Sequence, residues 1–361
     1  MLPSAQFWHG KRVLLTGHTG FKGAWLALWL QRLGAEVTGI ALPAATQPNL
    51  HALMGHSTCV ASHLCDLRDA QALKALARSA RPDIVFHLAA QALVRASYQQ
   101  PLETFSTNVM GTANLLEAVR DVDTVRVVVA ITTDKVYQNR EWQFPYREDD
   151  ILGGHDPYSA SKAAAEIVIA SYRAAFFLAS GVALASARAG NVIGGGDWSA
   201  DRLIPDAVRA WQVGQPLVIR NPLATRPWQH VLEPLAGYLQ LAHKLWDEPA
   251  LAAAYNLGPN PHEVTTVEEV IKLASTAYGY SVVSYEHNSS RPHEAGWLAL
   301  ETAKARAVLG IEPLWDLAES VRRTMAWYRA QNDGVPARTL CEVDIAQYEE
   351  KHVDQPGTGL S

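Results

Sequence analysis

KRVLLTGHTGFKG, residues 11–23, decides the fold of this 361-residue chain. Its first six residues, KRVLLT, have the pattern of a short buried strand, and Gly17, Gly20 and Gly23 follow as GxxGxxG. The next residues have helical periodicity, and Gly34 is placed to end that helix. A glycine-rich turn between a strand and a helix presents backbone N–H groups to a pyrophosphate. The segment predicts a dinucleotide-binding loop; the alternative is a turn that needs glycine only for its backbone.

Strand-like and helical segments alternate through the rest of the first half of the chain. Further strands are predicted at residues 36–41, 57–61, 83–88, 125–132 and 182–187. Helices are predicted at residues 69–79, 101–121 and 156–180. Alternation of helices with almost continuously apolar strands indicates a parallel sheet covered on both faces. The expected fold class is α/β, a doubly wound parallel sheet of the Rossmann type with a smaller, interleaved C-terminal substrate domain.

Glycine and proline become dense after residue 189, which marks a change in organisation. We assign residues 1–188 to the dinucleotide-binding domain, with a later contribution from about residues 226–250. Residues 189–332 are assigned mainly to the substrate domain. Residues 333–361 are expected to form a C-terminal tail.

Composition narrows the classes of protein that this chain can belong to. Apolar residues make up 48% and charged residues 19%, which is typical of a globular protein. A net charge of −5 gives no basic signal for nucleic acid or an anionic membrane. We find neither a secretory signal nor an apolar run of about 18 residues, so we expect a cytoplasmic protein without a membrane span. Cys59, Cys65 and Cys341 lack CxxC spacing, so neither a disulfide framework nor a metal site is expected.

The expected cofactor site extends from the glycine loop to the ends of later strands. NAD sites often carry an acidic residue after the second strand, but residues 40–43 read IALP, which leaves the choice between NAD and NADP open. Asp66 either accepts a hydrogen bond from adenine or caps the next helix. The candidate cofactor-binding residues are Gly17, Thr19, Gly20, Phe21, Lys22, Gly23, Asp66, Leu67, Leu88, Ala89, Ala90, Asn108, Tyr158 and Lys162.

Tyr158 and Lys162 form a YxxxK pair on a predicted helix, where a spacing of four residues puts both on one face. A nearby ammonium favours the phenolate, so Tyr158 is expected to act as acid or base well below its ordinary pKa of about 10. The pair opens the helix that follows the fifth predicted strand. The alternative is an ordinary pair of helix residues. The glycine loop together with this pair predicts an NAD(P)-dependent oxidoreductase site.

Thr133, Asp134 and Lys135 stand at the end of the fifth predicted strand. The carboxyl ends of strands in a doubly wound sheet face the ligand crevice, so these side chains are expected near Tyr158. A hydroxyl, a carboxyl and an amine exceed the needs of a simple alcohol dehydrogenase. They indicate further proton transfers, as in an elimination. The alternative is a charged loop after a strand.

From about residue 10 to residue 328 the chain resembles the CDP-glucose 4,6-dehydratases, within the extended short-chain dehydrogenase/reductase superfamily. The segments that carry the resemblance are GHTGFKGAW at 17–25, TTDKVYQ at 132–138, PYSASKAAAE at 157–166, RAGNVIGGGDW at 188–198, RPWQHVLEPL at 226–235 and RPHEAGWL at 291–298. Among these residues, Lys135 best distinguishes the CDP-glucose 4,6-dehydratases from related families. The similar dTDP-glucose dehydratases carry Asp-Glu at the positions of Asp134 and Lys135, and the 4-epimerases lack the Asp–Lys pair.

The resemblance implies a lyase that converts CDP-glucose to CDP-4-dehydro-6-deoxyglucose and water, with NAD retained as cofactor. It implies that Tyr158, helped by Lys162 and Thr133, removes the O4 proton, and that Asp134 protonates the leaving O6. Lys135 as the base for H5 is a hypothesis. By resemblance, the residues that bind the substrate diphosphate are Asn191, Arg226 and Arg291.

The resemblance also implies a homodimer, or a tetramer, built from the helices at residues 101–121 and 156–180. It implies deoxysugar synthesis for lipopolysaccharide O-antigen as the setting. Two enzymatic alternatives stay open: a 4,6-dehydratase for another nucleotide sugar, and a nucleotide-sugar 4-epimerase. A third is a catalytically idle dinucleotide-binding sensor or scaffold, which predicts a broken Tyr/Lys pair and so fits this sequence poorly.

Overall fold

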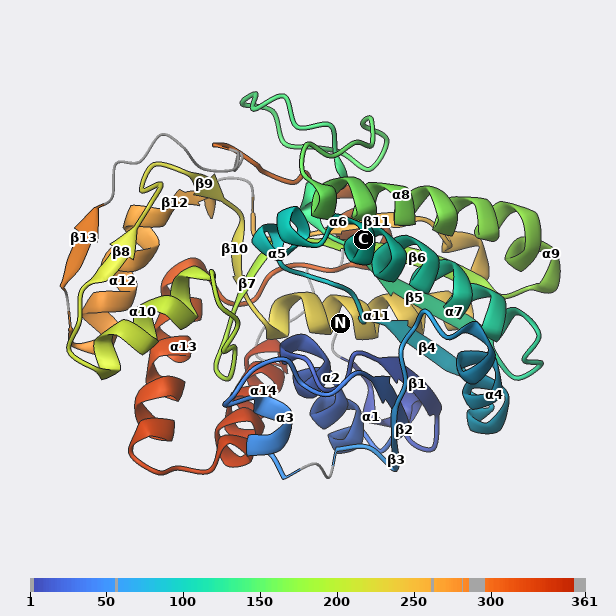
Figure 1. The fold of residues 1–361 in the computed structure, drawn as a ribbon. Helices are drawn as coiled ribbons and strands as arrows, with labels where there is room; N and C mark the ends of the chain where they lie inside the picture. The colour runs from blue at the N-terminus through green and yellow to red at the C-terminus, as the bar shows by residue number, and fades with distance from the viewer. Residues whose placement is uncertain (1–2, 56–57, 261–262, 281, 286–295, 354–361) are drawn as a thin grey trace, which may run out of the picture.

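A parallel sheet forms the centre of the computed structural model, which describes residues 3–55, 58–260, 263–280, 282–285 and 296–353. Within these residues seven strands pair in the order β11-β6-β5-β4-β1-β2-β3 (Figure 1). Their bounds are β1 Arg12–Thr16, β2 Glu36–Ala41, β3 Ala61–Leu64, β4 Ile84–His87, β5 Val127–Ile131, β6 Ala183–Ala189 and β11 Ala254–Leu257. Every pairing is parallel. The predicted α/β doubly wound fold is confirmed.

Helices cover both faces of the sheet because successive strand residues point to opposite sides. On one face Val13 and Leu15 pack with α2 (Phe21–Arg32) and α11 (Leu232–Asp247) in a single apolar core. On the other face Leu14 belongs to a second core. That core includes residues of α4 (Ala70–Ala80), α7 (Gly111–Arg120) and α8 (Pro157–Tyr172).

The two longest predicted helices are present, and each contains a π-helical segment. α6 (Pro101–Phe105) runs into the π segment Ser106–Met110 and then into α7. α8 is followed by the π segment Arg173–Phe177 and by α9 (Leu178–Ser180). By length and composition alone the stretch Pro157–Ser180 would be long and apolar enough to cross a membrane, the one such helix among the described residues. Its Lys162 and Glu166 are buried, and they contact the sheet through the carbonyl oxygen of Ile131 and the hydroxyl of Ser186.

The smaller lobe lies to the left of the sheet in Figure 1. It contains the helices α10 (Leu203–Gln212), α12 (Val267–Tyr278) and α13 (Leu317–Asn332). Three short strand pairs join them: β7 (Asn191–Ile193) with β10 (Trp228–His230), β8 (Leu217–Ile219) with β13 (Val283–Tyr285), and β9 (Thr225–Arg226) with β12 (Thr265–Thr266). The remaining short elements are α1 Ala5–Trp8, α3 Leu50–Leu53, α5 Val94–Gln99, the 3-10 turns Asp134–Val136 and Pro249–Leu251, and the π segment Ala305–Leu309.

Two boundaries in the sheet differ from the predicted ones. The third strand is Ala61–Leu64, not residues 57–61, because this edge strand carries the polar Ser62 and His63 and gives no apolar run. The late contribution to the large domain includes α11, inside the predicted residues 226–250, but also β11, which lies just beyond them. The division into residues 1–188 and 189–332 is otherwise an untested prediction.

The predicted C-terminal tail is wrong for most of its length. Ala337–Val353 is the helix α14, whose Cys341, Ile345 and Tyr348 are buried in the core beside α2. Trp29 Nε1 on α2 donates to Glu349 Oε1 on α14 at 2.9 Å. Apolar residues spaced three and four apart form the buried stripe of this helix, so the periodicity was present in the sequence.

Candidate active site

A cleft of about 820 Å³ opens at the carboxyl ends of the sheet strands. Residues that follow β1, β2, β4, β5 and β6 line its floor, and α10 and β8 of the smaller lobe line its other wall. In a doubly wound sheet this edge is where ligands bind. Most of the predicted site residues meet in this one cleft.

The glycine loop between β1 and α2 has the close approaches that a dinucleotide cradle needs. Gly17 has a φ of +80°, and a Cβ there would lie 2.8 Å from the backbone nitrogen of Ala89. A Cβ at Gly23 would lie 2.0 Å from the carbonyl oxygen of Gly17. Gly20 is the N-cap of α2 and offers its first N–H groups no side-chain acceptor. A helix start of this kind binds a pyrophosphate, so the loop fits the phosphates of a dinucleotide.

The surroundings of Asp66 decide between the two alternatives predicted for this residue. Asp66 lines the cleft, and its carboxylate accepts three hydrogen bonds from the Arg68 guanidinium, the shortest being 2.5 Å from Nη2. The N-cap of α4 is Asp69, which accepts from the backbone nitrogen of Ala72 at 3.0 Å. The helix-cap reading of Asp66 is therefore wrong. A role toward adenine stays a prediction.

Tyr158 and Lys162 occupy the first two turns of α8, and both line the cleft. Asp156 caps this helix by accepting from the backbone nitrogen of Ser159 at 2.9 Å, and Pro157 occupies its first turn. Lys162 Nζ donates to the carbonyl oxygen of Ile131, at the end of β5, at 3.2 Å. Burial lowers the pKa of Lys162 to about 8, against the opposing effect of Glu166. This lysine changes charge close to neutral pH.

The expected lowering of the Tyr158 pKa is not found, and that prediction is wrong for this structure. Burial raises the pKa of Tyr158 to about 12, and the charge of Asp134 adds to the rise. The hydrogen bond with Thr133 acts in the opposite direction but does not outweigh the loss of water. In the ligand-free protein Tyr158 is therefore a neutral phenol, because burial destabilises the phenolate more than the neighbouring groups stabilise it.

Thr133, Asp134 and Lys135 form a connected group at the end of β5. Asp134 Oδ1 accepts from Thr133 Oγ1 at 2.9 Å and from Lys135 Nζ at 3.0 Å. Lys135 Nζ also donates to Asn191 Oδ1 at 3.2 Å. Thr133 and Lys135 line the cleft, whereas Asp134 is fully buried just beneath it. Its Oδ2 has no hydrogen-bond partner among the described residues, which is unusual for a buried carboxylate.

A buried ion pair that we did not predict supports the start of α8. Glu166 Oε2 accepts from Arg188 Nη2 at 2.8 Å, and the two side chains are almost completely buried. Thr132 Oγ1 and Ser186 Oγ donate to the same carboxylate at 2.5 and 2.8 Å. Burial alone would raise the pKa of Glu166, but Arg188 and the two hydroxyls hold it below its ordinary value. The group ties α8 to β5 and β6, and so fixes the helix that carries Tyr158.

Besides Asp134, two predicted site residues lie away from the cleft surface or outside the described residues. Asn108 is buried behind the cleft wall, where its Nδ2 donates to Ser161 Oγ at 2.8 Å and its Oδ1 accepts from the backbone nitrogen of Gln91 at 2.8 Å. It therefore positions α8 and the loop after β4. Arg291 lies outside the described residues. Asn191 and Arg226 both line the cleft.

Several charged residues of the cleft were missed because folding brings them together from distant segments. Arg202 Nη1 pairs with Asp197 Oδ2 at 2.8 Å, and its charge acts on both Tyr158 and Lys22. Asp201 Oδ1 accepts from Arg95 Nη1 at 3.0 Å and from Arg220 Nη2 at 3.1 Å. No short motif in the sequence links these positions.

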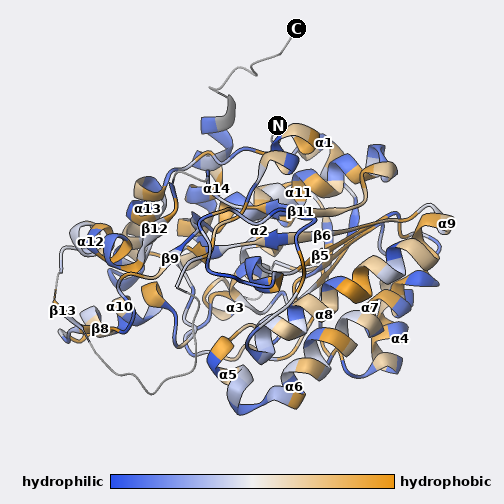
Figure 2. Cartoon of the chain, turned by 90° about the horizontal axis from the view of Figure 1, so that it is seen from above, coloured by the Kyte–Doolittle hydropathy of each residue, from blue (hydrophilic) through white to orange (hydrophobic). Residues whose placement is uncertain are grey.

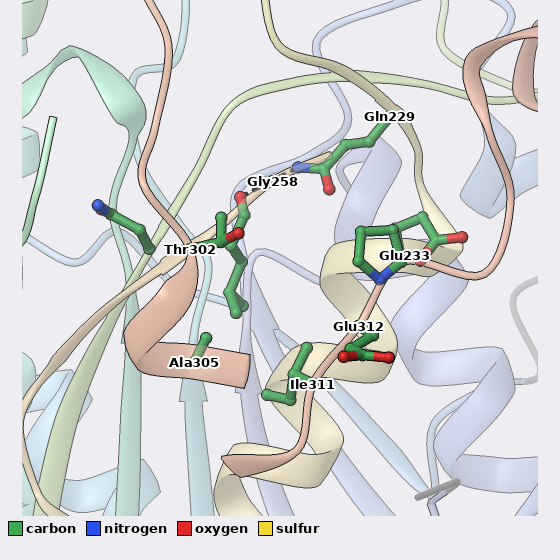
Figure 3. Close-up of a pocket in the computed structure, with 10 residues that line it drawn as sticks. Gln229, Glu233, Gly258, Thr302, Ala305, Ile311 and Glu312 are labelled. Atoms are coloured by element: carbon green, nitrogen blue, oxygen red, sulfur yellow. Dashed lines mark hydrogen bonds between the residues drawn. The ribbon is translucent and has the colours of Figure 1, made fainter. Parts of the chain in front are cut away.

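A second cavity, shown in Figure 3, has room for about 20 Å³ and lies between α11 and residues 311–313. This space suits a single water and not a nucleotide. Glu233 on its wall accepts from the backbone nitrogens of Leu314 and Trp315 and from the hydroxyl of Tyr348. These bonds attach α13 and α14 to α11, so the group is structural.

The glycine cradle after β1 and the Tyr158–Lys162 pair of α8 share one cleft of a doubly wound sheet. This combination defines an extended short-chain dehydrogenase/reductase. The family model for GDP-mannose 4,6-dehydratase matches residues 14–324. The chain belongs to that family.

Known relatives agree with this assignment. The chain is 47% identical over 348 residues to a CDP-glucose 4,6-dehydratase of Salmonella typhimurium, an alignment that covers 95% of this chain and 97% of that one. It is 28% identical over 339 residues to a dTDP-glucose 4,6-dehydratase of Streptomyces griseus, with 91% and 98% covered. The resemblance noted from the sequence motifs is confirmed.

Solved structures share the fold over most of the chain. MoeE5 in complex with UDP-glucose and NAD superposes with a TM-score of 0.75 at 25% identity, covering 89% of this chain and 99% of that one. The dTDP-glucose 4,6-dehydratase of Bacillus anthracis in complex with NAD gives a TM-score of 0.74 at 21% identity, covering 89% and 97%.

Proposed function

We propose that this protein is a CDP-glucose 4,6-dehydratase, which converts CDP-glucose to CDP-4-dehydro-6-deoxyglucose and water. The observation that carries the proposal is the Asp134–Lys135 ion pair at the cleft floor beside Tyr158, in a chain 47% identical to a CDP-glucose 4,6-dehydratase. A simple dehydrogenase needs only one proton-transferring group. A dehydratase needs a second acid and a base, which this pair supplies.

NAD is the cofactor that we assign, and the residues of the cleft fit it. Gly17, Gly20 and Gly23 would hold the pyrophosphate, and Leu88, Ala89 and Ala90 would face the rest of the dinucleotide with small or apolar surfaces. When bound, NAD takes up a hydride from C4 of the hexose and returns it to C6, so that no external oxidant is consumed.

In the oxidation step Tyr158 accepts the proton of O4 as the phenolate. In the ligand-free protein burial keeps Tyr158 neutral, although its hydrogen bond with Thr133 acts toward the phenolate. The positive charge of Lys162, one turn further along α8, and that of bound NAD would add to this effect. Thr133 Oγ1 is also bonded to Asp134 Oδ1 at 2.9 Å. The O4 proton can therefore pass from Tyr158 through the Thr133 hydroxyl to Asp134.

In the elimination step the 4-ketone acidifies H5, and water leaves across C5 and C6. A proton first passes from Lys135 Nζ to Asp134 Oδ1 within the ion pair. Lys135 then accepts H5, and Asp134 donates its proton to the leaving O6. Lys135 then returns its proton to C5. The proton taken from O4 replaces the one that Asp134 gave to O6, so the protons balance over one turnover. The 3.0 Å contact between Lys135 Nζ and Asp134 Oδ1 lets the pair exchange one proton.

The diphosphate of the substrate needs cations and hydrogen-bond donors. Asn191 and Arg226 line the cleft on the side of the smaller lobe, and guanidinium binds phosphate in a bidentate manner. The assignment of Arg291 to the same diphosphate is part of this proposal but rests on the sequence motif alone.

A homodimer is the assembly that we assign. Large apolar side chains are exposed along α6 to α9, among them Leu102, Met110, Ile167 and Leu178. Figure 2 shows apolar residues along α7 and α8 in the outer helical layer. Such a surface is typical of a protein–protein contact. We further assign a cytoplasmic location, without a nucleic-acid or membrane partner, and a place in O-antigen deoxysugar synthesis; these rest on composition and on the family resemblance.

A panel of nucleotide sugars tests the proposed function. Purified protein is incubated with CDP-, dTDP-, UDP- and GDP-glucose, and formation of a 4-keto sugar is followed. We expect rapid conversion of CDP-glucose and at most slow conversion of the others. Preference for another nucleotide, or a 4-epimer as product, would replace this proposal with one of its enzymatic alternatives.

A further inference from the structure

The part of the cleft that α10, β8 and the start of α12 line has no role in the chemistry described above. Asn191 belongs to β7 and Arg226 to β9, two short strands of the smaller lobe (Figure 1). Beyond them the cleft continues along the start of α10, along β8 and the residues after it, and to the start of α12. A nucleotide sugar with its hexose at Tyr158 and its diphosphate at Arg226 must place its base there.

The walls of this region suit a flat ring. Ile204, Leu217, Ile219 and Val267 line it, and three of these side chains are almost fully buried. Apolar walls of this kind bind the two faces of a base but do not distinguish one pyrimidine from another. Discrimination must come from polar groups at the edge of the region.

Two such groups, Asp206 and Arg220, are held in place by other side chains. Asp206 Oδ1 accepts from Arg209 Nη2, and Arg209 Nη1 donates in turn to the carbonyl oxygen of Trp198 at 2.9 Å. Arg220 Nη2 donates to Asp201 Oδ1 at 3.1 Å. Both Asp206 and Arg220 line the cleft.

The two groups are also electrostatically coupled. Burial raises the pKa of Asp206, while the charges of Arg209 and Arg220 act to lower it. A half-buried carboxylate therefore stands near a guanidinium at the base end of the cleft. The carboxylate is an acceptor only, and the guanidinium is a donor only.

We propose that Asp206 and Arg220 select cytosine, with Asp206 accepting from the N4 amino group and Arg220 donating to N3 and O2 of the ring. Cytosine presents a donor at N4 and acceptors at N3 and O2, which this pair complements. Uracil and thymine present an acceptor at O4 and a donor at N3, so the carboxylate would face O4 without a proton between them. Carboxylates recognise the amino group of cytosine in the same way in nucleic acids. This inference deepens the proposed function and rests on it.

Asp206→Asn tests the pair, because an amide keeps the shape and can still accept from Arg209 but can also donate to O4. We expect kcat/KM for CDP-glucose to fall roughly 10- to 100-fold, mainly through KM, because the base is bound alike in ground and transition states. The ratio of CDP-glucose to UDP-glucose activity should fall by at least as much. Arg220→Met should weaken CDP-glucose binding in the same way. Asp247→Asn, the same change at a position that does not line the cleft, should leave both activities unchanged.

A competition assay with free CDP and UDP gives the affinity for each nucleotide, a second measurement that does not depend on turnover. The wild type should bind CDP more tightly than UDP, and Asp206→Asn should reduce that difference. If the wild type prefers CDP-glucose but neither variant changes the preference, the inference is overturned while the proposed function stands. If the wild type does not convert CDP-glucose at all, the proposed function has failed instead. Melting curves for each variant establish that it is folded.

Discussion

Lys135 Nζ lies 3.0 Å from Asp134 Oδ1, so two neighbours in the sequence form an ion pair at the floor of the cleft. Asp134 is fully buried, and the side chain of Lys135 is 27% exposed. The pair therefore joins a covered carboxylate to an amine that lines the cleft. Tyr158 and Lys162 are common to many oxidoreductases; in the proposed function, this second pair provides for the loss of water.

Lys135→Met should abolish removal of H5 while leaving the protein folded. In D₂O we expect exchange of H5 with solvent to slow by about 100-fold or more, as for loss of a general base. Lys74→Met, which alters an exposed lysine paired with Asp121, serves as the control and should exchange like the wild type. Unimpaired exchange in Lys135→Met would assign the base to another residue.

Activity should fall as the pH rises above about 8. The pKa of Lys162 is lowered to about 8 by burial, so its charge is present below that pH and lost above it. Because that charge helps Tyr158 to give up its proton, kcat/KM for CDP-glucose should show a descending limb on the alkaline side. Lys162→Arg keeps its charge throughout, so whatever activity it retains should lack this limb. An identical limb in the variant would show that another group titrates.

Gly23→Ala should damage cofactor binding more than stability. A Cβ at this position would lie 2.0 Å from the carbonyl oxygen of Gly17, which forces the cradle to open. Overpacking of this kind predicts binding of NAD weaker by about 10-fold or more, measured by titration of the apoprotein. Gly258→Ala, where the nearest atom would be 3.7 Å from the new Cβ, is the matched control. Equal NAD affinity in both variants would contradict the assigned loop.

Glu233 should make the protein less stable as the pH rises from about 5 to 8. Burial raises its pKa from 4.5 to about 7, so between these values the native state holds a proton that the unfolded state releases. The stabilisation is complete below the lower pKa and lost as the pH passes the higher one. A pKa shift of this size corresponds to a change of about 3 kcal/mol in the free energy of unfolding.

Glu233→Gln should reduce that dependence, since the amide does not titrate. Chemical denaturation at a series of pH values gives, for the wild type and for the variant, the slope of the free energy of unfolding against pH. Asp344, whose pKa burial raises to about 6, contributes to both proteins alike and leaves a residual slope. Equal slopes in the two proteins would show that Glu233 does not hold a proton in the native state.

Much of the fold could be predicted because its signals are local. The apolar strands, the GxxGxxG and the spacing of Tyr158 and Lys162 are all properties of short segments, and the structure brings them together in one cleft. The edge strand β3 was misplaced because it has a single strand neighbour, β2, and its polar Ser62 and His63 leave no apolar run in the sequence. The helix α14 was overlooked although its buried stripe is regular.

The electrostatics of the site could not be predicted in the same way. The pKa of Tyr158 depends on how completely the fold removes water from its hydroxyl, and this reversed the expected direction. Asp201, Arg95 and Arg220 come from three segments, and only the packing of the smaller lobe on the sheet brings them within hydrogen-bonding distance. Such groups leave no motif in the sequence.

The fate of a label at C4 tests the central claim most directly. CDP-glucose carrying deuterium at C4 is converted by the holoenzyme in ordinary water, and the product is examined by NMR and mass spectrometry. An enzyme that eliminates water with an internal return of hydride should place the deuterium at C6 of CDP-4-dehydro-6-deoxyglucose. Deuterium found at C4 of an epimerised sugar, deuterium lost to solvent, or absence of a 4-keto product would contradict this account.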